Sequence, residues 1–130
     1  MLETGIKGQQ QTEVTYENSA AAVGSGLLEV FSTPCMIALM EKTASGSVQP
    51  YLDEGQGTVG IELRVKHLAA TPLGMTVRCE SELTEVDGRR LVFSVKAYDD
   101  AELIGEGTHE RFIINSDKFM AKAQAKAAKR

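Results

Sequence analysis

Long apolar runs are missing from this sequence of 130 residues, so no segment is expected to span a membrane. The first residues, MLETGIKGQQQ, also lack the apolar core of a signal peptide, and we therefore expect a cytoplasmic location. A basic excess is missing too, because the formal net charge is −4, which argues against nucleic-acid binding. At this length we expect a single domain that spans residues 1–130.

Motifs that hold metals or nucleotides are also missing. The sequence contains no CxxC, no HExxH, no glycine-rich phosphate loop and no internal repeat. We therefore predict no metal site and no cofactor. The two cysteines, Cys35 and Cys79, stand in different contexts, and in a cytoplasmic chain we interpret both as reduced, structural thiols.

One long helix is the clearest element that the sequence does contain. It is predicted for residues 33–50, TPCMIALMEKTASGSVQP, with Thr33 as its N-cap and Pro34 in the first helical position. Gly46 and Pro50 favour its end. At about 100° per residue, one face of the helix gathers Thr33, Ile37, Met40, Glu41, Ala44 and Val48. Glu41 is a carboxylate within this apolar stripe, and such a group has to be paired, neutralised or used in chemistry.

Segments before and after the helix alternate as strands do. A first strand is predicted for residues 8–17, and residues 17–32 are interpreted as a loop or short helical turn, either a lid or a plain connection. Four further strands are predicted over residues 57–69, 75–84, 89–98 and 101–115. One face of the first of these gathers Val59, Ile61, Leu63, Val65, His67 and Ala69.

Turn and end signals complete the prediction. Asp87-Gly88 predicts a hairpin, and Gly105 and Gly107 predict bulges or close approaches of the backbone. Residues 116–130 are predicted to form a helical tail that is capped by Ser116 or Asp117.

The order of strand, long helix and four strands predicts an α+β fold of the hot-dog type. In this arrangement a five-stranded antiparallel sheet wraps around the long central helix. Such a sheet leaves edge strands and a flat face to be covered, so we expect a homodimer, with further pairing into tetramers left open.

Three residues are candidates for chemistry from the pattern alone: Thr33, Glu41 and His67. A hydroxyl, a carboxylate and an imidazole that meet at one end of a pocket support acyl transfer. Each also has a plain interpretation, because Thr33 can be only a cap, Glu41 a rim residue, and His67 a hydrogen-bonded core residue. We interpret His109 as structural, and Arg111 either as an anchor for an anionic ligand or as the partner of an acid.

The segments VFSTPCMIALME, YLDEGQGTVGIELRVKHLAATPLGMTV, EVDGRRLVFSVKAYD and IGEGTHERFII resemble the hot-dog thioesterases related to fluoroacetyl-CoA thioesterase. The resemblance covers about residues 30–120 and includes polar positions and turns. It implies hydrolysis of an acyl-CoA, with coenzyme A as part of the substrate. It also implies that Thr33, Glu41 and His67 form the catalytic set and that Gly60 and Arg111 contact the substrate.

One stretch departs from the family pattern. The fluoroacetyl-specific enzyme carries phenylalanines before the central helix, whereas this sequence has Gly24 and Leu27 in the corresponding stretch, VGSGLLEVFS. We therefore expect a thioesterase for small acyl groups that is not selective for fluoroacetyl-CoA. A non-catalytic acyl-CoA-binding or sensing module is the alternative, and a hot-dog hydratase ranks last because no hydratase motif is found.

Overall fold

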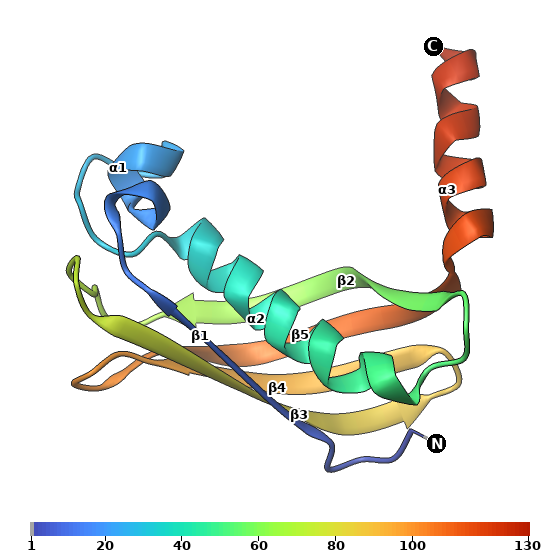
Figure 1. Cartoon of the computed structure of the whole chain (residues 1–130), viewed down its shortest axis with the longest axis horizontal. Helices are drawn as coiled ribbons and strands as arrows, with labels where there is room; N and C mark the ends of the chain where they lie inside the picture. Colours follow the sequence, from blue (N-terminus) through green and yellow to red (C-terminus); the bar gives the residue numbers. More distant parts are fainter. Residues whose placement is uncertain (1) are drawn as a thin grey trace.

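The computed structural model describes residues 2–130 as an antiparallel five-stranded sheet with one long helix lying across it (Figure 1). In the sheet, the strands follow the order β1-β3-β4-β5-β2. The strands are β1 (Lys7–Glu13), β2 (Gln56–His67), β3 (Thr76–Asp87), β4 (Arg90–Tyr98) and β5 (Leu103–Asn115). The helices are α1 (Ala20–Val23), α2 (Thr33–Val48) and α3 (Ser116–Ala125), with single 3-10 turns η1 (Tyr16–Asn18), η2 (Gln49–Tyr51) and η3 (Lys126–Lys129). The α+β prediction is confirmed.

The N-cap of helix α2 lies one residue earlier than predicted. Ser32 is the N-cap, and its hydroxyl accepts a hydrogen bond from the Cys35 backbone N–H at 3.2 Å. Thr33 is therefore the first helical residue, and its side chain is free for another contact. The helix ends at Val48, and the chain continues into η2, which contains Pro50.

The buried face of α2 is also rotated from the prediction. Its buried residues are Met36, Leu39, Met40, Thr43, Ala44 and Val48. Compared with the predicted stripe, this arc is turned by roughly 60° about the helix axis. Glu41 consequently lies at the margin of the buried face, with 39% of its side chain exposed, and Thr33 is exposed.

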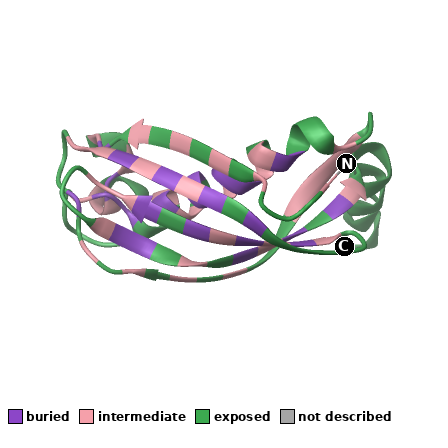
Figure 2. Cartoon of the chain, turned by 90° about the horizontal axis from the view of Figure 1, so that it is seen from below, coloured by how far each residue is buried: buried purple, intermediate pink, exposed green. Residues whose placement is uncertain are grey.

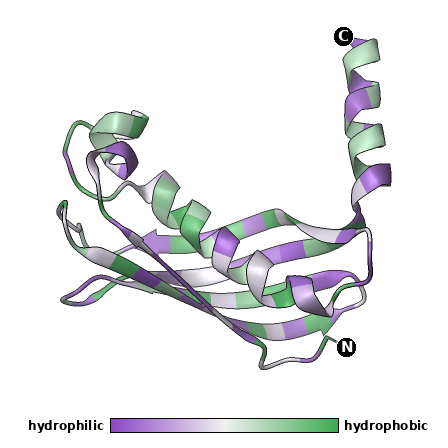
Figure 3. Ribbon diagram, viewed as in Figure 1, coloured by the Kyte–Doolittle hydropathy of each residue, from purple (hydrophilic) through white to green (hydrophobic). Residues whose placement is uncertain are grey.

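Strands β3 and β4 supply most of the sheet side of the core. Their inward residues are all buried: Val77, Cys79, Ser81, Leu83, Leu91, Phe93, Val95 and Ala97. Along these strands buried residues alternate with half-buried or exposed ones, as predicted (Figure 2). Polar and apolar residues largely follow the same alternation (Figure 3). The predicted hairpin is confirmed, since Asp87 pairs with Arg90 and Gly88 has a φ of +61°.

A bulge in β2 makes the predicted face of that strand wrong in its first half. The register of β2 on β5 shifts between Gly60 and Glu62, so Ile61 is the extra residue and is 53% exposed. Leu63, Val65 and His67 keep the predicted face. Before the bulge, the position that faces α2 is Gly60 instead of its neighbours.

Two glycines of β5 allow close approach, as predicted. A Cβ at Gly105 would lie 2.5 Å from the Met36 sulfur, and one at Gly107 would lie 2.0 Å from the Arg64 backbone oxygen. The helix and β2 therefore approach β5 at positions where no side chain fits.

The two ends of the chain also differ in detail from the prediction. The first strand is confined to Lys7–Glu13, because η1 already begins at Tyr16. Asn115, not Ser116 or Asp117, caps α3 by accepting from the Lys118 backbone N–H. Helix α3 projects away from the sheet and carries no buried residue (Figure 1). Within residues 2–130, no helix has the length and apolarity needed to cross a membrane.

Candidate functional site

A hydroxyl–imidazole pair lies at the N-terminal end of α2. Thr33 Oγ1 and His67 Nδ1 are 2.7 Å apart, which joins the first turn of the helix to the last residue of β2. Burial lowers the pKa of His67 below its ordinary value of 6.5, so the imidazole is neutral at neutral pH. A neutral imidazole next to a hydroxyl can accept its proton, which is the arrangement that general-base chemistry requires.

The pair opens onto a groove of about 320 Å³ that is bordered by the α1 region. Its walls include Ser25, Val30, Leu68 and both members of the pair. His67 Nε2 is buried and has no hydrogen-bond partner among the described residues. One nitrogen of this ring is therefore held by Thr33 while the other remains available.

A second cluster surrounds the carboxylate of Glu41. Arg111 Nη1 donates to Glu41 Oε2 at 3.3 Å, and the same guanidinium donates to the side chain and carbonyl of Thr58 at 2.7 and 2.8 Å. The Arg111 side chain is 8% exposed. Burial lowers the pKa of Arg111 from its ordinary value and the Glu41 carboxylate opposes this shift, so the two form a partly buried ion pair.

His109 completes this second cluster, although its sequence context indicated a structural role. It is fully buried, its Nδ1 lies 2.9 Å from the Glu62 carbonyl, and its Nε2 lies 3.1 Å from Arg111 Nη1. Burial lowers its pKa, and the Arg111 charge adds to the effect. The spacing of His109, Arg111 and Ile113, which all face inward, is the period-two signal that would have found it.

Gly60 provides the space that this cluster occupies. A Cβ at Gly60 would lie 2.6 Å from Glu41 Oε2, 3.2 Å from His109 Cε1 and 3.3 Å from Arg111 Nη1. The predicted substrate residues Gly60 and Arg111 are therefore adjacent to Glu41. A side chain at position 60 would push the carboxylate aside.

The predicted trio does not meet within one chain. Thr33 and His67 touch, whereas the polar partners of Glu41 are Arg111 and, at 4.0 Å, His109. Eight residues of helix separate Thr33 from Glu41, which is a rise of roughly 12 Å. The expectation that all three groups gather at one end of a pocket is thus not met by the single chain.

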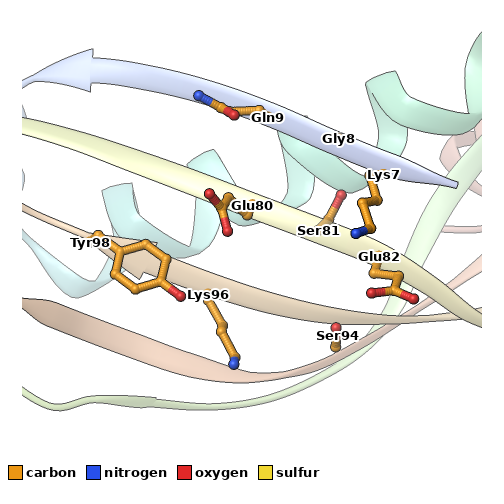
Figure 4. A pocket seen from close by; sticks show the side chains of 9 residues that line it. All are labelled: Lys7, Gly8, Gln9, Glu80, Ser81, Glu82, Ser94, Lys96 and Tyr98. Atoms are coloured by element: carbon orange, nitrogen blue, oxygen red, sulfur yellow. The ribbon is translucent and has the colours of Figure 1, made fainter. Parts of the chain in front are cut away.

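A hollow larger than this groove lies elsewhere, on the outer face of β1, β3 and β4 (Figure 4). It has a volume of about 450 Å³, but none of the candidate residues lines it. In the strand register Lys7 lies opposite Glu82 and Lys96 opposite Glu80, so positive and negative residues alternate across this face. We therefore place the candidate site by its chemistry, at α2 and β2. Within residues 2–130, no group of His, Cys, Asp and Glu side chains is arranged to hold a metal ion.

Comparisons with known proteins show which family the chain resembles. A sequence model of the family described as "FlK: Fluoroacetyl-CoA-specific thioesterase" matches residues 14–117. The fluoroacetyl-CoA thioesterase of Streptantibioticus cattleyicolor is 47% identical over 98 residues, which cover 75% of this chain and 70% of that protein.

Solved structures give the same result for the fold. The fluoroacetyl-CoA thioesterase FlK superposes with a TM-score of 0.92 at 36% identity, covering 97% of this chain and 98% of the other. A form of FlK in complex with acetyl-CoA also superposes with a TM-score of 0.92. A thioesterase superfamily member from Thermus thermophilus reaches a TM-score of 0.89 at 28% identity, over 98% and 94% of the two chains. The hot-dog fold and the family resemblance are confirmed.

Proposed function

The chain belongs to the family of fluoroacetyl-CoA-specific thioesterases, and on that premise we propose that it is a thioester hydrolase acting on acyl-CoA. Water is added across the thioester bond, so the products are the carboxylic acid and the free thiol of CoA. The observation that carries the proposal is the Glu41 carboxylate, which Arg111 and the space at Gly60 hold at the margin of the helix. We also predict that this chemistry needs no metal and no further cofactor. The cytoplasmic location likewise stays a prediction.

The proposed roles follow from the chemistry of each group. The Gly60 N–H polarises the thioester carbonyl, and Arg111 binds the acyl group or the developing carboxylate. His67, whose pKa is lowered, donates the proton that the thiolate of CoA takes up as it leaves, and Thr33 orients the imidazole.

Two routes are open to Glu41. In the first, a carboxylate oxygen attacks the carbonyl and expels the thiolate, and water then hydrolyses the resulting anhydride. In the second, the carboxylate removes a proton from the water that attacks. Turnover in ¹⁸O-labelled water tests the first route: ¹⁸O enters the Glu41 side chain when water opens the anhydride at the Glu41 carbonyl, and the second route cannot produce this label.

The acyl group is proposed to be small but not specifically fluoroacetyl. Support comes from the segment between α1 and α2, which borders the groove and contains Leu27 at 95% and Leu28 at 69% exposure, with no aromatic side chain before Phe31. We expect similar kcat/KM values for acetyl-CoA and fluoroacetyl-CoA. A preference of more than about 100-fold for fluoroacetyl-CoA, or about 2.7 kcal/mol, would overturn this part of the proposal.

We also propose a homodimer in which the two clusters of the site come from different subunits. Strand β2 is an edge of the sheet, and exposed edges of this length are usually paired. Antiparallel pairing of two β2 strands about a two-fold axis places the Gly60 part of one strand toward the His67 end of the other. Glu41 of one subunit would then approach the Thr33–His67 pair of its partner.

Complementation of two inactive variants tests this assembly. Glu41→Gln and His67→Ala are prepared separately and then mixed under conditions that exchange subunits. If the site is shared between subunits, each mixed dimer contains one intact site, and about a quarter of the wild-type activity should return. If each site lies within one chain, no activity returns, and a monomer in sedimentation experiments would exclude the dimer itself.

Thiol release from a panel of acyl-CoAs tests the function. Acetyl, fluoroacetyl, phenylacetyl and medium-chain CoA esters are compared for the wild type. The thioesterase is supported if the wild type hydrolyses any of these esters and the Glu41→Gln variant does not. Absence of turnover, with acyl-CoA still raising the melting temperature, would favour the alternative of a non-catalytic acyl-CoA-binding module.

A further inference from the structure

His109 is fully buried, and the chemistry of its two neighbours fixes its protonation. A backbone carbonyl can only accept, so Nδ1 carries the hydrogen that is donated to Glu62 O at 2.9 Å. A guanidinium can only donate, so Nε2 is the bare nitrogen that accepts from Arg111 Nη1 at 3.1 Å. The ring is therefore neutral and is held as a single tautomer.

These two hydrogen bonds connect the parts of the second cluster. The Glu62 carbonyl belongs to the β2 bulge that turns Gly60 toward α2, so the Nδ1 bond fixes the bulge. The Nε2 bond takes one hydrogen of Arg111 Nη1, and the same nitrogen donates to Glu41 Oε2. Packing against Phe93, with ring centroids 6.3 Å apart, holds the imidazole in place.

We propose that His109 is a positioning residue that aims Arg111 Nη1 at the Glu41 carboxylate through its bare Nε2. The inference rests on the proposed function, because it takes Glu41 and Arg111 as working groups. His109 itself stays behind Arg111 and Gly60 and does not reach the substrate. Without the Nε2 acceptor, the guanidinium keeps its two bonds to Thr58, but Nη1 loses the contact that sets its direction.

Two substitutions separate the functions of the two ring nitrogens. In His109→Asn the side-chain amide reaches the place of Nδ1 and still donates to Glu62 O, but nothing accepts from Arg111. In His109→Gln the amide oxygen reaches the place of Nε2 and still accepts from Arg111. Both shorten or replace the ring, so both leave a comparable packing defect and serve as controls for each other.

Acetyl-CoA hydrolysis is measured for both variants with kcat and KM determined separately. We expect kcat to fall about 10- to 100-fold in His109→Asn with KM changed less than about threefold, and to recover within a few-fold of wild type in His109→Gln. Equal losses in the two variants, or a fully active His109→Asn, would overturn the proposal, because a role in packing or in the bulge alone predicts that pattern.

Nitrogen NMR of the imidazole provides a test that does not depend on activity. Long-range ¹H–¹⁵N spectra of the wild type at neutral pH should show His109 neutral with the proton on Nδ1. Arg111→Met should shift the Nε2 resonance, while Arg64→Met, at an exposed arginine on β2, should not. A proton on Nε2 would overturn the proposal. If the wild type hydrolyses no acyl-CoA but the spectra are as expected, the proposed function fails and the hydrogen-bond arrangement stands.

Discussion

Replacing Gly60 with alanine tests how closely the Glu41 cluster is packed. The added Cβ would lie 2.6 Å from Glu41 Oε2, whereas ordinary van der Waals contact begins at 3.4 Å. The carboxylate must therefore move by about 0.8 Å from its observed position. Misplacement of a catalytic group by about 1 Å can cost on the order of 100-fold in rate, so we expect kcat to fall by about that factor.

Stability should change much less than activity in this variant. Gly60 does not have a positive φ, and the atom that must yield is the end of a flexible, partly exposed side chain. We expect a loss of no more than about 1 kcal/mol in the free energy of unfolding, partly offset by the lower entropy of the unfolded chain.

Gly57→Ala is the matched control for Gly60→Ala. It lies on the same strand, and its added Cβ would meet only the Ser116 hydroxyl at 3.4 Å. Thiol release from acetyl-CoA and urea unfolding are measured for both variants. A Gly60→Ala protein with wild-type kcat would refute the idea that the space at this glycine is what seats Glu41.

Three further predictions follow from particular contacts. Thr33→Val removes the hydroxyl that lies 2.7 Å from His67 Nδ1, so thiol release should slow by about tenfold. Thr33→Ser keeps the hydroxyl and should retain most of the rate. Equal rates for the two variants would contradict a role for the hydroxyl. Burial lowers the pKa of His67 and His109 below 6.5, so the unfolded chain binds more protons than the folded one below that pH. The contribution of these two histidines to the free energy of unfolding should therefore be constant above neutral pH and be lost on acidification below about pH 6.5. Denaturant titrations that show a gain in stability there would contradict the assignment. Gly107→Ala places a Cβ 2.0 Å from the Arg64 backbone oxygen, which cannot move without breaking the strand pair. Unfolding experiments should therefore show a loss above about 3 kcal/mol in the free energy of unfolding. A variant as stable as wild type would contradict the observed β2–β5 register.

The parts of the fold that the sequence predicted well are those with one unambiguous pattern. In β4, Phe93, Val95 and Ala97 are separated by the polar residues Ser94 and Lys96, and the observed burial follows this alternation. Helix α2 was predicted with the wrong phase, because its MIALM segment places apolar residues on most of the helix surface and several phases bury similar amounts. Long-range packing against the sheet, which no local pattern records, selected the face that contains Met36.

The candidate site was predictable for its single residues but not for their grouping. His67 stood in an apolar strand face and does lie beside the helix. The bulge at Ile61 could not be predicted, because the alternation of apolar residues continues unbroken through it. That bulge brings Gly60, instead of a side chain, to Glu41, and it brings the Glu62 carbonyl to His109, so the second cluster depends on a backbone irregularity.

Thiol release by the wild type and the Glu41→Gln variant, side by side on the acyl-CoA that the wild type hydrolyses fastest, tests the central claim most directly. The substitution keeps the shape of the side chain and removes its charge and basicity. We expect most of the turnover to disappear while the affinity for free CoA, measured by calorimetry, changes little. Unimpaired turnover in Glu41→Gln would contradict the assignment of this carboxylate to the chemistry.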